Sequence, residues 1–147
     1  MHHPGIQSYR RTQVMTADPK RLVIMCYEAV IENLKAGKQK LMDRDYEAKG
    51  KALTRGRDIL NELICGLDFD KGGAVAAHLD ALYNYMVRRI FHADVDKDIP
   101  AIDEVIGLLQ ELLSAWKEIA YPEGNTLQAD VAKFRGAGPF QTNHIRL

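Results

Sequence analysis

Carboxylates are the residues of this sequence with the widest scope for chemistry, because inward carboxylates on facing helices hold di-iron centres. Such a centre also needs Glu-x-x-His pairs, which place two ligands on one face of a helix. No Glu-x-x-His occurs in the sequence. We therefore expect no metal cofactor, and we expect the helical acids to form solvated faces. These acids are Glu28, Glu32, Glu47, Glu62, Glu104, Glu111 and Glu118.

A short acidic run, Asp94-Val95-Asp96-Lys97-Asp98, places oxygens at alternate positions, as the first half of a calcium-binding loop does. Ile99 stands where such a loop needs a turning glycine, and Val105 stands where a bidentate glutamate closes the site. The run therefore predicts no calcium site. Asp98 is better explained as the cap of a following helix.

Nucleophilic catalysis needs a thiol or hydroxyl beside a base, and Cys26 with His78 or His92 has the residue types. The sequence alone leaves that pairing open. However, Cys26 and Cys65 both lie within apolar helical patterns, which are typical of buried free thiols. Gly72-Gly73 lacks the following Lys-Ser or Lys-Thr of a phosphate-binding loop. We predict that the protein is not an enzyme and carries no cofactor.

The length and charge of the chain favour one domain without a charged target. A chain of 147 residues suits a single domain. Charged residues make up 27% of it and cancel to a formal net charge of +0, so no overall field attracts nucleic acid or anionic lipid. No run of about 18 apolar residues occurs, and the N-terminus lacks a basic region followed by an apolar stretch. We expect a soluble, cytoplasmic protein that binds neither nucleic acid nor membrane.

Apolar residues spaced by three and four predict four helices. Asp18-Pro19 is a strong helix start, and the helix continues to about Met42. Asp45 is available to cap the second helix and Asp98 the fourth. The apolar stripe of the fourth helix comprises Ile102, Val105, Ile106, Leu109, Leu112, Leu113, Trp116 and Ile119.

The third helix is expected after a turn at residues 68–73, which contain two adjacent glycines, and it continues to about Ala93. Four such helices with short connections and no run of β period predict an all-α fold, an antiparallel four-helix bundle over residues 18–120. Residues 1–17 then form an N-terminal cap segment, and residues 121–147 form a C-terminal tail.

Three segments form a recognisable series. The run Tyr9-Arg10-Arg11-Thr12-Gln13-Val14-Met15-Thr16-Ala17-Asp18-Pro19, followed by Met25-Cys26-Tyr27, has a tyrosine, then Val-x-Thr-Ala, then a polar cap before proline. Leu82-Tyr83-Asn84-Tyr85-Met86-Val87-Arg88-Arg89-Ile90 and Ala115-Trp116-Lys117 follow it in order. Together these segments resemble the flagellar secretion chaperones for flagellin, the FliS family, over about residues 9 to 120.

The resemblance implies a cytoplasmic chaperone without catalysis or cofactor. Its client is the disordered C-terminal segment of flagellin, which lies along hydrophobic grooves, stays unpolymerised and passes to the cytoplasmic domain of the flagellar export gate. An anti-sigma factor or a co-chaperone is a further partner. The alternative from another class is a helical adaptor that binds a flagellar regulatory protein such as an anti-sigma factor.

The resemblance also points to residues for a client groove. Those on helical stripes suit core packing as well as client contact, whereas those before the first helix cap match a stretch that covers an empty groove in this family. Tyrosine and methionine suit a groove, since tyrosine gives a large contact area and methionine packs adaptably. The predicted partner-binding residues are Tyr9, Val14, Met15, Met25, Tyr27, Tyr83, Tyr85 and Met86.

The tail contains a short apolar pattern of its own. Leu127, Val131 and Phe134 fall at i, i+4 and i+7, which gives two helical turns one apolar edge. One interpretation is a free chain end. The other is a segment that packs into an apolar groove and competes with the client.

Overall fold

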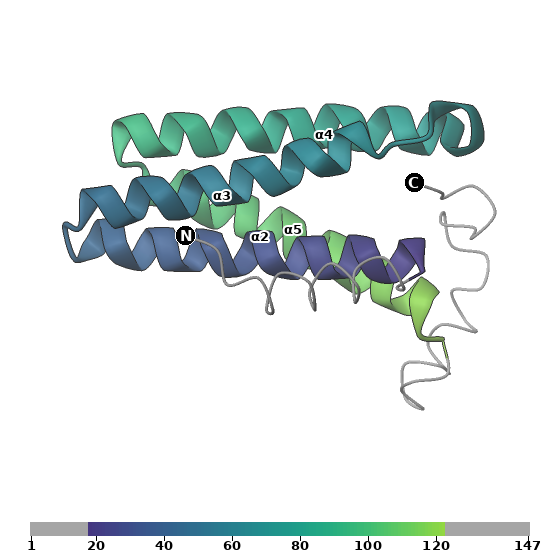
Figure 1. The fold of residues 1–147 in the computed structure, drawn as a ribbon, viewed down its shortest axis with the longest axis horizontal. Helices are drawn as coiled ribbons and strands as arrows, with labels where there is room; N and C mark the ends of the chain where they lie inside the picture. The colour runs from purple at the N-terminus through teal and green to yellow at the C-terminus, as the bar shows by residue number, and fades with distance from the viewer. Residues whose placement is uncertain (1–17, 123–147) are drawn as a thin grey trace, which may run out of the picture.

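The computed structural model describes residues 18–122, and the proposed N-terminal cap segment and nearly all of the proposed tail lie outside them. Figure 1 shows that each helix runs back in roughly the opposite direction to the one before it. The predicted all-α antiparallel four-helix bundle is confirmed, and residues 18–122 contain no strand. The four helices are α2 (Pro19–Met42), α3 (Tyr46–Cys65), α4 (Phe69–Asp96) and α5 (Ile99–Ala120).

Aspartates begin the helices, as the sequence predicts. The Asp18 carboxylate accepts a hydrogen bond from the N–H of Lys20 at 2.8 Å, and Pro19 occupies the first turn of α2. The carboxylates of Asp45 and Asp98 each accept a bond from the amide three residues further on, at 3.2 Å and 3.1 Å. Each bond satisfies an amide that has no partner within its own helix. The three predicted caps are therefore confirmed.

The turn predicted at residues 68–73 is wrong in part. Asp68 caps α4 by accepting a bond from the N–H of Lys71 at 3.0 Å, and the helix begins at Phe69. Gly73 has φ 51° and ψ −128°, a conformation that is accessible at low cost only to glycine. The glycine pair thus puts a kink inside α4 instead of a turn before it.

Four helix–helix seams surround one core. Helix α2 packs against α3 and α5, and α4 packs against the same two helices, so the helices follow chain order around the bundle. Their apolar stripes meet at the centre, as expected for amphipathic helices. The largest fully buried side chains are Trp116, Tyr27, Tyr83, Leu34, Leu53, Leu60, Met86, Ile90, Ile102, Leu109, Val23 and Val30.

The α2–α3 seam is the most closely packed of the four. Gly37 is buried, and a Cβ atom added to it would lie 2.6 Å from Leu53 Cδ2. Across the same seam, a Cβ added to Gly56 would lie 3.4 Å from Leu34 Cδ2. The two helices therefore approach closely because glycines stand where they cross.

Candidate functional site

The predicted groove residues separate into three groups in the structure. Tyr27, Tyr83 and Met86 have no exposed surface and belong to the core. Met25 and Tyr85 are half-buried at the bundle surface. Tyr9, Val14 and Met15 lie outside the described residues.

Tyr27 and Tyr83 join α2 to α4 across the middle of the bundle. Their hydroxyls share a hydrogen bond, and their rings meet edge to face at 6.2 Å between centroids. The Trp116 ring packs against Tyr27 in the same manner at 6.4 Å, which adds α5 to the cluster. Burial raises the pKa of Tyr83 to about 12 and raises the pKa of Tyr27 further, since a phenolate cannot be solvated there. These tyrosines fix the spacing of three helices.

An apolar strip on α5 lies beside this core without being fully buried. We name it the α5 strip: Leu108, Leu112, Ala115 and Ile119, all half-buried. Its members follow Glu104 by 4, 8, 11 and 15 residues, which places them on the same flank of the helix as Glu104. Glu104 contacts α4, so the α5 strip lies along the flank of α5 nearest that helix.

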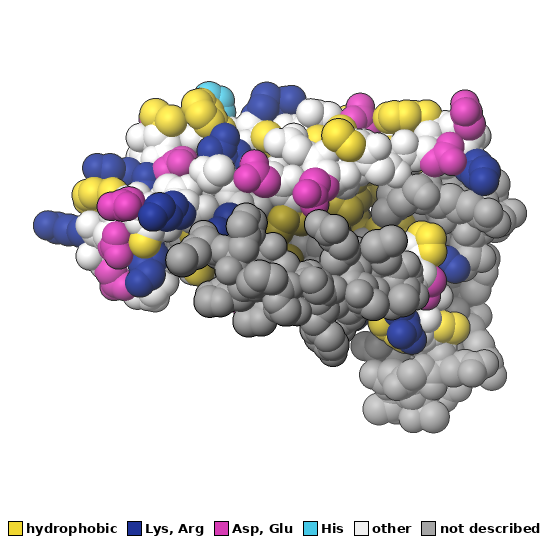
Figure 2. All heavy atoms as spheres, in the orientation of Figure 1, with side chains coloured by type: hydrophobic (Ala, Val, Ile, Leu, Met, Phe, Trp, Pro, Cys, Tyr) yellow, Lys and Arg dark blue, Asp and Glu magenta, His cyan; other side chains and the backbone are white. Residues whose placement is uncertain are grey.

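Helix α4 contributes further apolar side chains to this seam. Leu82 and Val75 are half-buried, and they precede Tyr85 by 3 and 10 residues on its flank of α4. Figure 1 shows that α4 and α5 lie close where residues 97 and 98 join them and separate toward the far end of α5. Figure 2 shows one face of the bundle, on which hydrophobic side chains lie among charged ones. The separation explains why these apolar residues keep exposed surface.

A polar cluster closes the narrow end of the seam. The Tyr85 hydroxyl and the Arg89 Nε both donate to the Glu104 carboxylate, the latter at 2.8 Å. The Tyr85 hydrogen bond, followed by the one from Arg89, lowers the pKa of Glu104. The bond to Glu104 raises the pKa of Tyr85 because it holds the phenol proton. The cluster links α4 to α5 in the half of the seam nearer their connection.

The outer border of the α5 strip is acidic. Glu104, Glu111 and Glu118 recur every seven residues, which puts them on one edge of α5 beside the strip. The strip thus has a row of carboxylates along one side. Such a surface suits an amphipathic helix with basic residues next to its apolar edge.

The opposite flank of α5 is held by ion pairs with α2. Lys38 Nζ lies 2.8 Å from Asp103 Oδ1, and Lys117 Nζ lies 3.6 Å from Glu28 Oε2. Met25 is three residues before Glu28, which places it on this flank of α2. A shallow hollow of about 350 Å³ follows the seam and is lined by Lys35, Lys38, Gln39, Met42, Asp103 and Ile106.

The α3–α4 seam contains a buried lysine. Lys49 is 6% exposed, and its ammonium donates to the carboxylate of Asp94 and, at 3.0 Å, to the Asp94 carbonyl. Further along the seam, the Arg57 guanidinium stacks over the exposed ring of Phe91 at 5.3 Å. These contacts hold α3 to α4 by charge as well as by packing.

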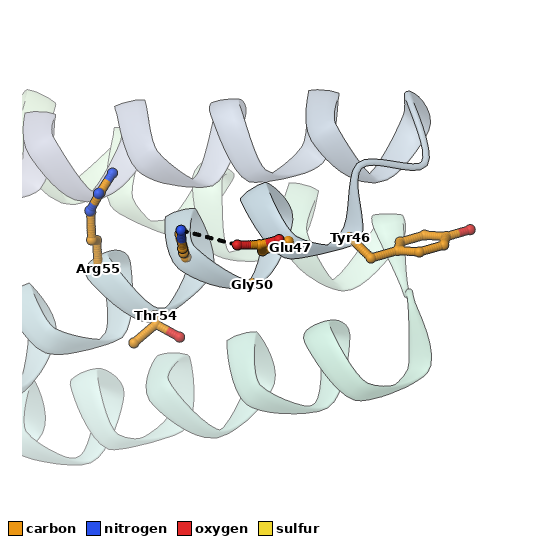
Figure 3. A pocket seen from close by; sticks show the side chains of 6 residues that line it. Tyr46, Glu47, Gly50, Thr54 and Arg55 are labelled. Carbon is orange, nitrogen blue, oxygen red and sulfur yellow. Dashed lines mark ion pairs between the residues drawn. The ribbon is translucent and has the colours of Figure 1, made fainter.

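A hollow of about 600 Å³ lies on the surface of α3, and Figure 3 shows the residues along it. Lys51 and Glu47 form an ion pair at 3.3 Å within it, whereas Tyr46 projects at the end of the bundle. The hollow is open and contains no cluster of groups with catalytic geometry among its lining residues. They are Tyr46, Glu47, Gly50, Lys51, Thr54 and Arg55.

The acidic run at the α4–α5 connection serves structure. Asp94 pairs with Lys49, and Asp98 caps α5. Within residues 18–122, histidine, cysteine and carboxylate side chains nowhere gather in a group of three that could hold a metal ion. Burial raises the pKa of Cys26, with a smaller contribution from Glu62, and neither effect favours a reactive thiolate.

A comparison with known families decides what this bundle is. The family described as flagellar protein FliS matches residues 1–123 of the chain. The chain belongs to the FliS family. It is 39% identical to the flagellar secretion chaperone FliS of Salmonella typhimurium over 121 residues, which are 79% of this chain and 90% of that protein.

Proteins with lower identity to this chain occur in other bacteria. The flagellar secretion chaperone FliS of Vibrio cholerae is 34% identical over 129 residues, 85% of this chain and 94% of that protein. The one of Bacillus subtilis is 28% identical over 116 residues, 79% of this chain and 86% of that protein. The resemblance seen in the sequence is therefore confirmed at the level of the FliS family. No helix within residues 18–122 of this FliS family member has the length and apolar character to cross a membrane.

Three structural residues escaped the sequence interpretation. The sequence analysis singled out neither Leu108 nor Lys49, and Gly37 carried no signal in the apolar pattern. Lys49 could have been found, because it precedes Leu53 by four residues and therefore lies on the apolar stripe of α3. Gly37 depends on where two helices cross, which no periodicity states.

Proposed function

We propose that this FliS family member is a cytoplasmic export chaperone that binds the disordered C-terminal segment of flagellin. It prevents premature polymerisation and delivers the client to the flagellar type III export apparatus. Family membership and the names of the relatives support the chaperone role. We choose the α5 strip as the client-binding surface because it is apolar and only half-buried, although the core beside it is complete.

The physical properties of the client fit this surface. A flagellin end that forms coiled-coil contacts in the filament exposes an apolar stripe before assembly, and that stripe self-associates unless it is covered. Completing the burial of Leu108, Leu112 and Ile119 adds about 1 kcal/mol for each side chain. A client that folds on binding also loses ordering entropy, so the complex is stable enough to protect and weak enough to release.

The predicted groove residues take different roles in this proposal. Tyr85 contacts the client where the α5 strip meets the polar cluster, and Met25 contacts a second part of the client at the α2–α5 seam, on the opposite flank of α5. The buried tyrosines, Tyr27 and Tyr83, hold the helices at the spacing that keeps the α5 strip open, and Met86 packs with them. Tyr9, Val14 and Met15 cover the groove when it is empty.

The proposal is tested by titrating the full chain with a peptide covering about the last 40 residues of the host's flagellin, followed by calorimetry at several temperatures. We expect a one-to-one complex with gained helicity and a negative heat-capacity change. The double substitution Leu108→Ser and Leu112→Ser should weaken binding about tenfold or more, since the client loses its apolar contact.

The matched control is Phe91→Ser, which removes an exposed apolar side chain from the α3–α4 seam. It should leave the affinity unchanged. Equal weakening by both variants would mean that the α5 strip is not the client surface. Absence of binding at tens of micromolar would favour the adaptor function, with a regulatory protein as partner.

A further inference from the structure

The tail of this chain has the features of an internal ligand for the α5 strip. Residues 124–147 lie beyond the part that matches the FliS family, and they are outside the described residues. Helix α5 ends at Ala120, one residue after the last member of the strip, Ile119. The tail is therefore tethered at the open end of the surface that it would cover.

The apolar residues of the tail are separated by the same intervals as those of the α5 strip, in the opposite chain direction. From Ile119 back to Ala115 and Leu112 the intervals are four and three residues. From Leu127 forward to Val131 and Phe134 they are also four and three. An antiparallel helix would bring each tail residue opposite one strip residue, with Val131 over the small Ala115 and Phe134 over Leu112. Both series span about 10 Å at the helical rise of about 1.5 Å per residue.

The connection and the charges agree with this arrangement. Pro122-Glu123-Gly124-Asn125 is short and turn-forming, as an antiparallel helix pair requires, and Thr126 can cap the helix that follows. Lys133 and Arg135 flank Phe134, so one of them would face the acidic border of α5 beside Glu111.

We propose that residues 126–136 dock in cis on the α5 strip as a short antiparallel helix and compete there with the client. The docking itself concerns this chain alone, whereas the competition rests on the proposed function. A tethered segment acts at high effective concentration, so even weak contacts keep the strip covered until a longer client displaces it.

Hydrogen exchange of the full chain, measured by mass spectrometry without flagellin, tests the docking. Amides of residues 127–134 should exchange more slowly than an unfolded chain does. V131D with F134D should remove that protection, and so should Leu112→Ser on the strip. The control I145D with L147D, which places two acids in the same tail outside the pattern, should retain it.

Exchange at the unfolded rate in the wild type, or protection that survives Leu112→Ser, would overturn the docking. Protection that grows with protein concentration would overturn docking in cis, because it would mean that two copies exchange tails.

The competition has a separate readout. If the tail covers the strip in about nine molecules of ten, V131D with F134D should raise the affinity for the flagellin peptide about tenfold. Unchanged affinity with a protected tail would overturn the competition and leave the docking intact. If no variant binds the peptide, the proposed function fails, while the exchange measurements still decide whether the tail docks.

Discussion

Between α2 and α3, Gly37 lets the buried side chain of Leu53 approach within 2.6 Å of the position a Cβ would take. Between α4 and α5, Leu108 and Leu112 keep exposed surface, although Leu109, which lies between them in the sequence, is fully buried. The first seam is closed by the side chains of its own two helices, whereas the second carries apolar side chains that pack against the core and are covered only in part. A bundle can thus be stable along one side and available for binding along another.

Enlarging Gly37 in the α2–α3 seam gives the largest expected effect. Gly37→Leu should lower the free energy of unfolding by about 3 kcal/mol, because Leu53 is buried and has little room to move. Urea denaturation measures the change. Gly50→Leu is the matched control, since a Cβ there meets nothing within 4 Å, and it should be neutral or stabilising through helix propensity. If both variants lowered the free energy of unfolding by a similar amount, the close packing of the α2–α3 seam would not be the cause.

The tyrosine pair that spans the core gives the next largest effect. Tyr27→Phe should lower the free energy of unfolding by about 1–2 kcal/mol, because the buried Tyr83 hydroxyl loses its hydrogen-bond partner. The double variant Tyr27→Phe with Tyr83→Phe should cost less than the sum of the two single variants. Additive losses would show that the two hydroxyls are not coupled.

The same pair predicts an alkaline limit to stability. Its folded pKa values are raised, to about 12 for Tyr83, above the ordinary value of 10.0, so its contribution is complete below pH 10.0 and is lost as pH rises toward 12. Thermal melts between about pH 9 and pH 12 should show a fall in Tm that is smaller in the double Phe variant. An equal fall in both proteins would remove the tyrosines as its cause.

A change in the polar cluster of Tyr85, Arg89 and Glu104, between α4 and α5, should give the smallest effect. Glu104→Gln removes a carboxylate that accepts bonds from Tyr85 and Arg89, and a slight loss of Tm is expected at neutral pH. The pKa of Glu104 is lowered, so the difference from the wild type should shrink as pH falls below 4.5. A difference that persists in acid would mean that the carboxylate charge is not responsible.

Much of the bundle could be predicted because its signals are local. Asp18, Asp45 and Asp98 begin helices through bonds that reach two or three residues, and those bonds depend on nothing distant. The kink at Gly73 was misjudged as a turn, since the pair of glycines permits both, and Asp68 starts the helix before the pair is reached. The candidate site was less accessible, because Tyr27 and Tyr83 satisfy the same helical periodicity whether they face a partner or the core.

The sequence alone determined that this protein is a four-helix bundle of the flagellar chaperone type, because helix periodicity, caps and family motifs are properties of short stretches of chain. Only the tertiary structure decided which apolar residues are enclosed. Leu109 and Leu112 are equally apolar and lie on one stripe of α5, yet Leu109 is fully buried in the core and Leu112, where α4 and α5 separate, is only half-buried. Exposure depends on where neighbouring helices lie, and that position follows from the packing of the whole bundle.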